Sequence, residues 1–198
     1  MGQNEVDEHK MSGNYTIVSE APVIIYAQQK SITERRMDAD YYRPEFVDNQ
    51  IRLEDSGFAI HELKDLWLEG KYGTLPDSSD YSSKGVVLIR GGDFRDLSVV
   101  DDENLVRVPM SYWESSFKAR AHPGEVLLLA KGATIDGPNS VALCSARFDK
   151  VLVNGSIFRI KTKPDVDAAY LTAYMATSTF LLQDRKSTRL NSSHGKLS

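Results

Sequence analysis

The chain has 198 residues, of which 41% are hydrophobic and 26% charged, and its formal net charge is −4. This length suits one ordinary domain with flanking segments, and the composition excludes a broadly disordered chain. No apolar run approaches the roughly 20 residues that a transmembrane helix requires. The polar, acidic N-terminus excludes a secretory signal, and the single cysteine, Cys144, fits a reducing compartment. We therefore expect a cytoplasmic protein that does not associate with a membrane.

The distribution of charge matters more than its total. Residues 1–81 contain 8 Lys and Arg against 16 Asp and Glu, whereas residues 82–163 contain 12 against 9, and residues 164–198 contain 4 against 3. The acidic residues thus precede a weakly basic middle section. Such a section suits a nucleic-acid partner, but it also suits an ordinary solvated surface.

The first third of the chain predicts few elements. Tyr15–Val18 is strand-like within a polar lead-in, and Val23–Tyr26 fits either a strand or the start of a helix. Within residues 37–54 a helix is predicted that has Pro44 in its first turn and that Gly57 ends. The helical spacing of this segment is carried by Phe46, Val47, Gln50, Ile51 and Glu54.

The middle section alternates loops with firm strands. Leu63–Leu66 predicts one helical turn. Gly70–Gly85 predicts a long polar loop, because its residues are mostly polar and it contains glycine and proline, which are typical of turns. Val86–Arg90 is typical of a buried strand. Ser111 and Glu114 fit a capping box, with Ser111 as the N-cap of a short helix.

The remaining segments predict most of a sheet and a last helix. The further strands are expected at Glu125–Ala130, Val141–Cys144, Val151–Val153 and Ser156–Ile160. Asn154-Gly155 is typical of a hairpin turn between the last two of them. Asp167 is expected to cap a helix that extends to Leu182. The predicted fold is α/β (α+β), with one twisted sheet, mixed or antiparallel, and flanking helices.

We expect three regions along the chain. Residues 1–34 form a polar lead-in or linker, and residues 35–185 form the domain. Residues 186–198 read as a non-native or disordered tail, because their low apolar content breaks the pattern and resembles translated sequencing-adapter read-through.

The sequence contains no convincing catalytic motif. Gly132–Gly137 has the glycine spacing of a phosphate loop, but Pro138-Asn139 replaces the required Lys and hydroxyl residue. The four histidines lack ligand spacing. A nuclease would combine Glu45, Glu62 and Lys64 around a metal, but such charges are common by chance in a charged chain, and a solvated helix face is the favoured explanation. We expect no catalytic residue, no metal and no cofactor.

Five motifs follow one another in an order that resembles a known family. They are Arg36–Phe46 (RMDADYYRPEF), Leu63–Leu66 with Gly73–Pro76 (GTLP) and Tyr81 before Gly85, Val87–Phe94 (VLIRGGDF), Pro123–Gly137 (PGEVLLLAKGATIDG), and Asn154–Ser156 with Ala169–Met175. Together they resemble the DNA specificity domain of type I restriction–modification specificity (S) subunits. One departure is that Thr74 directly follows Gly73, where the family has a residue between them.

The resemblance implies a noncatalytic protein that recognises double-stranded DNA. In that family two such domains, separated by long helices, each read half of a split target. The helices dock DNA adenine methyltransferase subunits, and a motor subunit adds restriction. The chain has one such domain and stops where a spacer helix would continue, so it resembles a half-subunit or a truncated sequence.

The candidate DNA-binding residues lie on polar loops beside the predicted strands. They are Thr74, Tyr81, Ser82, Ser83, Lys84, Arg90, Lys131, Thr134 and Asn139. Lys84, Arg90 and Lys131 suit phosphates or guanines, whereas Ser83 and Asn139 suit base edges. Ordinary surface loops remain the alternative interpretation of all of them.

Three other functions stay open at this stage. The nearest alternative is a recognition domain cut from a fused restriction enzyme–methyltransferase, which would have the same DNA-binding role. A protein-interaction module would use the Tyr, Trp and Phe side chains as anchors. A small nuclease would use Glu45, Glu62 and Lys64, and metal-dependent cleavage would reveal it.

Overall fold

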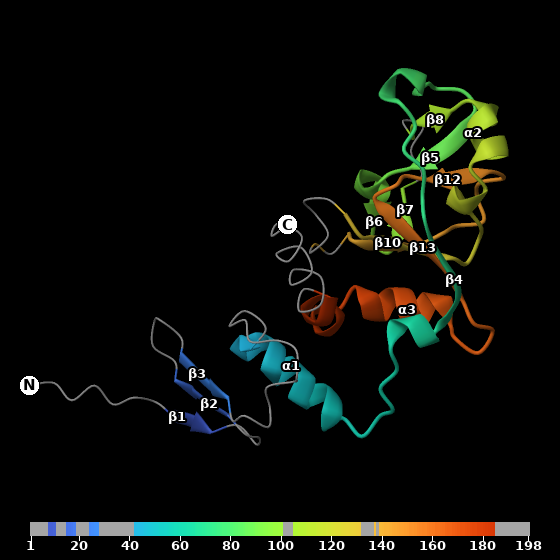
Figure 1. Cartoon of the computed structure of the whole chain (residues 1–198). Coiled ribbons are helices and arrows are strands. Elements are labelled where there is room, and N and C mark those ends of the chain that lie inside the picture. The colour runs from blue at the N-terminus through green and yellow to red at the C-terminus, as the bar shows by residue number, and fades with distance from the viewer. Residues whose placement is uncertain are drawn as a thin grey trace, which may run out of the picture. The chain divides into compact units, whose positions relative to one another are not determined.

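The computed structural model of the protein describes residues 8–10, 15–18, 24–27, 42–100, 105–131, 137 and 139–184. It contains two compact units, Met1–Ile60 with Leu182–Ser198, and His61–Leu181. The described residues contain helices together with a three-stranded, a six-stranded and a four-stranded sheet (Figure 1). The fold class is therefore α+β, as the sequence predicts. Within the described part of the chain, no helix is long and apolar enough to cross a membrane.

The described residues of the first unit include an antiparallel sheet and the helix α1 (Pro44–Glu54). The strands are β1 (Glu8–Lys10), β2 (Tyr15–Val18) and β3 (Ile24–Ala27). β2 is the predicted strand, and β3 shows that Ile24–Tyr26 of the ambiguous run is extended. α1 begins at Pro44, where the missing N–H of proline leaves no helical hydrogen bond unmade. It ends just before Gly57, which has a φ of +74°.

The second unit is built on two sheets. The six-stranded sheet contains, in spatial order, β4 (Trp67–Tyr72), β13 (Ile157–Thr162), β10 (Val126–Leu129), β11 (Val141–Leu143), β7 (Ser98–Val99) and β6 (Phe94–Arg95). The four-stranded sheet contains β8 (Arg107–Val108), β5 (Val86–Ile89), β12 (Val151–Val153) and β9 (Arg120–Ala121). Only the pairs β11–β7 and β12–β5 are parallel among the named strands. Both sheets are therefore mixed.

The single sheet predicted from the sequence is wrong, because its strands are divided between these two sheets. β5 and β12 pair with each other in the four-stranded sheet, whereas β10, β11 and β13 belong to the six-stranded one. The predicted hairpin at Asn154-Gly155 is wrong for the same reason. The turn itself forms, with Ile157 N donating to Asn154 O at 2.9 Å. It passes the chain from one sheet to the other instead of pairing β12 with β13.

Burial on both faces explains the apolar strands. Val87 and Ile89 of β5 meet Leu127 and Leu129 of β10 in a core cluster between the two sheets. Val86 and Leu88 face the other way, into a cluster partly covered by α2 (Met110–Ser115). A strand covered on both faces reads as a continuous apolar run. Leu127 and Leu129 are 0% and 5% exposed, as the predicted buried strand requires.

The outer face of the six-stranded sheet is covered by α3 (Ala168–Met175). Its side chains Leu171 and Met175 pack against β10, β11 and β13. Asp167 caps it as predicted, since its Oδ1 accepts hydrogen bonds from the N–H groups of Ala169 (2.8 Å) and Tyr170 (3.0 Å). The predicted extension to Leu182 is interrupted after Met175, and residues 178–184 form a further helical segment.

Two local predictions are corrected. Ser111 is not an N-cap: α2 starts one residue earlier, and Pro109 occupies the cap position with no side-chain cap bond. The long loop predicted from Gly70 starts only after Tyr72, because β4 occupies Trp67–Tyr72. The predicted helical turn before it is present as the 3-10 helix η2 (Leu63–Asp65).

Candidate nucleic-acid interface

The carboxyl ends of four strands from both sheets meet at one place in the second unit. We call it the strand-end junction and define it by Gly73–Thr74 after β4, Arg90–Asp93 after β5, Ala130–Lys131 after β10 and Asn154–Ser156 after β12. Backbone hydrogen bonds join these segments. Asn154 N donates to Ile89 O at 2.8 Å, and Ala130 N donates to Ser156 O at 2.9 Å. The junction thus ties the two sheets together.

Thr74 forms the centre of this junction. Its N–H donates to Val153 O at 2.9 Å, and its carbonyl accepts from Gly155 N at 2.7 Å. The approach is so close that a Cβ on Gly73 would lie 2.0 Å from Val153 O. The hydroxyl of Thr74 lies 3.5 Å from Ser116 Oγ. The backbone of Thr74 is therefore a structural part of the junction, and its half-buried side chain faces the start of the 3-10 helix η5 (Phe117–Ala119).

Arg90 is held by its own turn. Its backbone N–H donates to Asp93 Oδ2 at 2.7 Å, and its Nη2 lies 3.4 Å from Asp93 Oδ1. Asp93 is buried, whereas the Arg90 side chain is 40% exposed. Much of the guanidinium charge is therefore compensated within the protein, which weakens Arg90 as a phosphate contact relative to an unpaired lysine.

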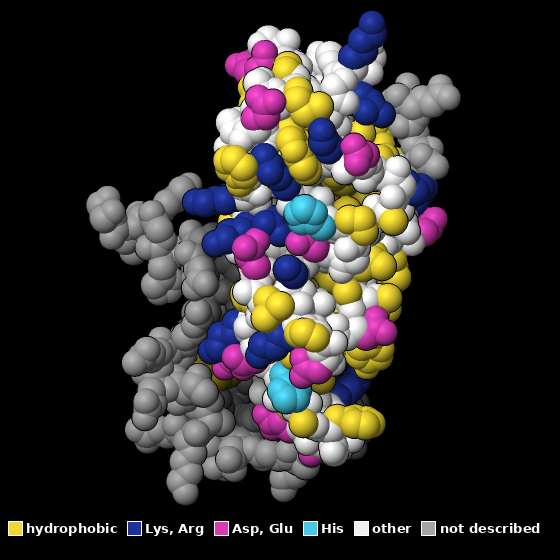
Figure 2. All heavy atoms as spheres, turned by 90° about the vertical axis from the view of Figure 1, so that its right-hand side faces the viewer, with side chains coloured by type: hydrophobic (Ala, Val, Ile, Leu, Met, Phe, Trp, Pro, Cys, Tyr) yellow, Lys and Arg dark blue, Asp and Glu magenta, His cyan; other side chains and the backbone are white. Residues whose placement is uncertain are grey.

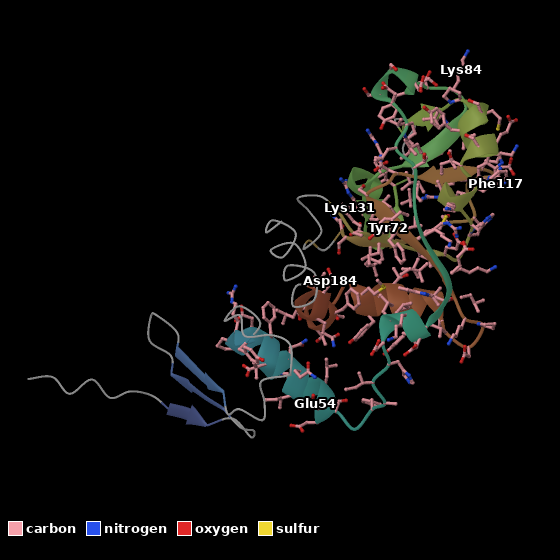
Figure 3. The ribbon with its side chains drawn as sticks, viewed as in Figure 1. Glu54, Tyr72, Lys84, Phe117, Lys131 and Asp184 are labelled. Carbon is pink, nitrogen blue, oxygen red and sulfur yellow. The ribbon has the colours of Figure 1, made fainter. Side chains whose placement is uncertain are left out.

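Lys131 is exposed at the junction and lies against an aromatic ring. Its Nζ is 4.7 Å from the centroid of Tyr72, the last residue of β4. Figure 3 shows the two side chains next to each other. Lys131 is thus the candidate cation whose position the structure defines best.

Four further candidates, Tyr81, Ser82, Ser83 and Lys84, lie in the loop that leads to β5. Ser82 forms a two-way backbone bridge with Arg107, at 2.9 and 3.1 Å, and its Oγ donates to Lys84 O at 2.5 Å. Tyr81 is half-buried and packs against the cluster on the outer face of β5. Ser83 and Lys84 are exposed, and Figure 3 shows Lys84 well apart from Lys131. Tyr81 is therefore mainly a core residue, whereas Lys84 is available to a ligand.

Two candidates complete the set. Asn139 is exposed, close in sequence to the start of β11. Thr134 lies outside the described residues. The structure therefore brings Thr74, Arg90 and Lys131 together at the junction and puts Tyr81–Lys84 in a separate loop.

Sequence reasoning missed several exposed side chains near the junction. Leu75 and Phe117 are 77% and 65% exposed. Arg120 stacks between two rings, with its guanidinium carbon 4.1 Å from the centroid of Phe117 and 4.5 Å from that of Trp113. Figure 2 shows basic side chains interspersed with hydrophobic and acidic ones on the face that is at the right of Figure 1. No spacing rule identifies such a stack, because its members lie on different short elements.

A buried ion group stabilises the same part of the fold. Arg159 of β13 is 7% exposed and forms ion pairs with Glu125, at 2.8 Å, and with Glu69. Its Nε also donates to Lys118 O at 2.9 Å. Cys144 lies near Glu125, and burial, followed by the Glu125 charge, raises the pKa of its thiol to about 12. Arg159 already has partners within the protein, and the Cys144 thiol stays protonated at neutral pH, so we assign both to structure rather than to binding.

The residues of the nuclease alternative form ion pairs with side chains close to them in the sequence. Glu62 and Lys64 pair with each other on the exposed surface of η2, which raises the pKa of Lys64. Glu45 belongs to the first unit and pairs with Arg43 at 2.8 Å. Among the described residues, no group of three His, Cys, Asp or Glu side chains is arranged to hold a metal ion.

No protein-family model and no curated protein matches the sequence. Among the solved structures, nine chains match it, and they include the following two. A chain of the type I R-M system, from work on its complex assembly and conformational transition, has a TM-score of 0.48 and 15% identity, over 73% of this chain and 36% of that one. The HsdS subunit from Thermoanaerobacter tengcongensis has a TM-score of 0.43 and 15% identity, over 76% of this chain and 44% of that one.

The chain therefore spans less than half the length of either solved structure. At this identity and TM-score, the assignment of a function rests on the sequence motifs and on the strand-end junction itself.

Proposed function

We propose that this chain is a DNA target-recognition domain of a type I restriction–modification specificity subunit. In this proposal the chain is noncatalytic, acts in the cytoplasm and needs no cofactor. It binds double-stranded DNA and directs DNA adenine methyltransferase subunits and a motor/restriction subunit to the target.

The observation that carries the proposal is the convergence of motifs at the strand-end junction. The motif segments Gly73–Pro76, Val87–Phe94, Pro123–Gly137 and Asn154–Ser156 are far apart in the sequence. Their described residues are nevertheless joined by direct backbone hydrogen bonds. Short matches that arise by chance have no reason to meet in space. Motifs that define a scaffold for recognition loops are expected to do so.

In this proposal some exposed side chains contact phosphates and others contact base edges. Lys84 and Lys131 are exposed cations that suit phosphate contacts, which position the duplex and release bound counterions. Ser83 and Asn139 are exposed and carry both donors and acceptors, so they suit base edges in the major groove. Thr74 and Arg90 hold the junction and are expected to affect binding through it.

The test is a titration of a random-sequence DNA duplex and of a selected target duplex, each at two salt concentrations. Lys84→Ala and Lys131→Ala are each expected to weaken binding to every sequence and to flatten the salt slope by roughly one unit. Asn139→Ala and Ser83→Ala are expected to change which sequence is preferred, at about 1–3 kcal/mol per lost base contact.

Lys150→Ala is the matched control. Lys150 is also an exposed lysine, but it precedes β12 and so lies at the end of that strand opposite to the junction. Its replacement is expected to leave the salt slope unchanged. The proposal fails if the wild-type chain binds no duplex at low salt, either alone or with a methyltransferase partner.

A protein-interaction module is the second candidate, and the exposed Leu75 and Phe117 favour it. Large apolar side chains in water are typical anchors of protein interfaces. Replacing both with serine separates the two functions. DNA affinity is unchanged if these residues contact a protein partner alone.

A further inference from the structure

Tyr72 is the side chain beside Lys131, and none of the sequence motifs includes it. The Nζ of Lys131 lies 4.7 Å from the centroid of the Tyr72 ring. This is within the ~6 Å over which a ring face attracts a cation. Tyr72 is 47% exposed, so the pair is reachable from solvent. Figure 3 shows both side chains at the junction.

The Tyr72 ring is itself fixed by a row of aromatic side chains. Phe158 meets Tyr72 edge-on at a centroid distance of 4.9 Å and meets Trp67 at 5.4 Å. Such edge-to-face contacts restrict the orientation of both rings. The Phe158 ring also lies across Gly70, where an added Cβ would be 2.4 Å from Cζ of Phe158. The three rings of Trp67, Phe158 and Tyr72 therefore form a row, and Tyr72 at one end of it contacts Lys131.

The backbone of Lys131 is fixed independently. Its N–H and that of Ala130 both donate to Ser156 O, at 3.2 and 2.9 Å. Lys131 is thus held at its backbone by the β12–β13 turn and at its ammonium by Tyr72. A free lysine loses side-chain entropy when it binds a ligand, whereas a lysine that is already ordered loses less.

We propose that Tyr72 is a positioning residue that holds the Lys131 ammonium for contact with a nucleic-acid phosphate. This inference rests on the proposed DNA-binding function and adds to it a residue outside the motifs. Tyr72 acts through its ring rather than its hydroxyl, since the contact is with the ring centroid. Phenylalanine can therefore replace it, but an aliphatic side chain cannot.

The binding test uses a random-sequence duplex and the whole chain at low salt. Tyr72→Phe is expected to bind like wild type. Tyr72→Leu, which keeps apolar bulk without a π-face, is expected to raise Kd about two- to fivefold, or about 0.5–1 kcal/mol at ~1.4 kcal/mol per tenfold. In a Lys131→Ala background, Tyr72→Leu is expected to have no further effect, since the group that it positions is gone.

Tyr170→Leu is the matched control, because Tyr170 is 74% exposed and lies on α3, which contributes no residue to the strand-end junction. It is expected to leave Kd unchanged. A readout without DNA is the proton shift of the Lys131 side-chain methylene next to Nζ, measured by NMR. Wild type and Tyr72→Phe are expected to show an upfield ring-current shift relative to Lys150, and Tyr72→Leu is expected to lose it.

The outcomes separate the two proposals. A wild-type chain that binds no duplex refutes the proposed function. Binding that Lys131→Ala weakens but Tyr72→Leu leaves unchanged refutes the positioning role alone. A wild-type Lys131 methylene shift equal to that of Lys150 also refutes the positioning role, whatever the DNA titration shows.

Discussion

Replacing Gly73 with alanine tests the strand-end junction directly. The new Cβ would lie 2.0 Å from Val153 O and 2.3 Å from Asn154 O. Both neighbours are backbone atoms of the β12–β13 turn, so no flexible side chain can move aside. The turn must shift, which strains the hydrogen bonds from Thr74 N to Val153 O and from Gly155 N to Thr74 O.

Two hydrogen bonds at roughly 1 kcal/mol each, together with overpacking of about 1–3 kcal/mol, give an expected loss of about 3–5 kcal/mol in the free energy of unfolding. For a unit of this size the melting temperature should fall by roughly 10–20 °C. Chemical denaturation followed by circular dichroism measures the first quantity, and a thermal scan measures the second.

Gly92→Ala is the control, since no described atom lies within 4 Å of its added Cβ and its φ is not in the left-handed region. It is expected to be neutral or slightly stabilising, by up to about 1 kcal/mol. A Gly73→Ala variant within about 0.5 kcal/mol of wild type would refute the description of the junction, since ordinary surface substitutions fall within that range.

Three other predictions concern stability and activity. Arg159→Leu leaves the buried Glu125 carboxylate without its ion-pair partner and should lower the free energy of unfolding by about 3–5 kcal/mol. Lys161 is exposed on the same strand, so Lys161→Leu should lower it by under about 0.5 kcal/mol. Equal losses for the two variants in denaturant titrations would contradict the buried ion pair. The pKa of Cys144 is about 12 in the folded protein and ordinarily 9.0, so the thiol of the unfolded chain ionises first as the pH rises. The free energy of unfolding should therefore fall between pH 9 and 12, and Cys144→Ala should remove the contribution of this thiol to that fall. Rapid labelling of the native thiol at pH 8 would argue against its burial. The purified chain should not cleave DNA with Mg²⁺, and cleavage that Glu62→Ala abolishes would overturn the noncatalytic assignment.

Local structure was predictable where one short segment determines it. Pro44 begins α1 and Asp167 caps α3, because both effects depend on backbone groups within a few residues. The capping box at Ser111 failed although its residue types were right. Tyr112 N already donates to Pro109 O at 3.0 Å, so the helical turn starts before Ser111 and leaves it inside the helix.

The division into two sheets was not predictable from the pattern. β5 and β12 are buried at every position, so they carry no alternation that would indicate which face meets which layer. β4 was missed because its burial does not alternate regularly and it contains Gly70, which reads as a loop residue. Gly70 is there because the Phe158 ring occupies the space of a side chain, a contact between distant strands.

The candidate site shows the same limit. Lys131 was predicted because it follows an apolar strand within a motif, and it is exposed at the junction. Tyr72 was not predicted, since its relation to Lys131 depends on the pairing of β4 and β10 with β13. Nor could the sequence reveal that Arg90 is tied to Asp93, because a turn with this geometry needs the backbone conformation as well as the residue types.

Recognition of a DNA sequence by this chain can be measured by selecting bound duplexes from a randomised pool and then titrating the enriched sequence and a scrambled version of it. The enriched sequence is expected to bind at least tenfold more tightly than its scramble, and Asn139→Ala or Ser83→Ala should alter the enriched sequence. Repeated selection that enriches no sequence, while nonspecific binding persists, would contradict sequence recognition by this chain.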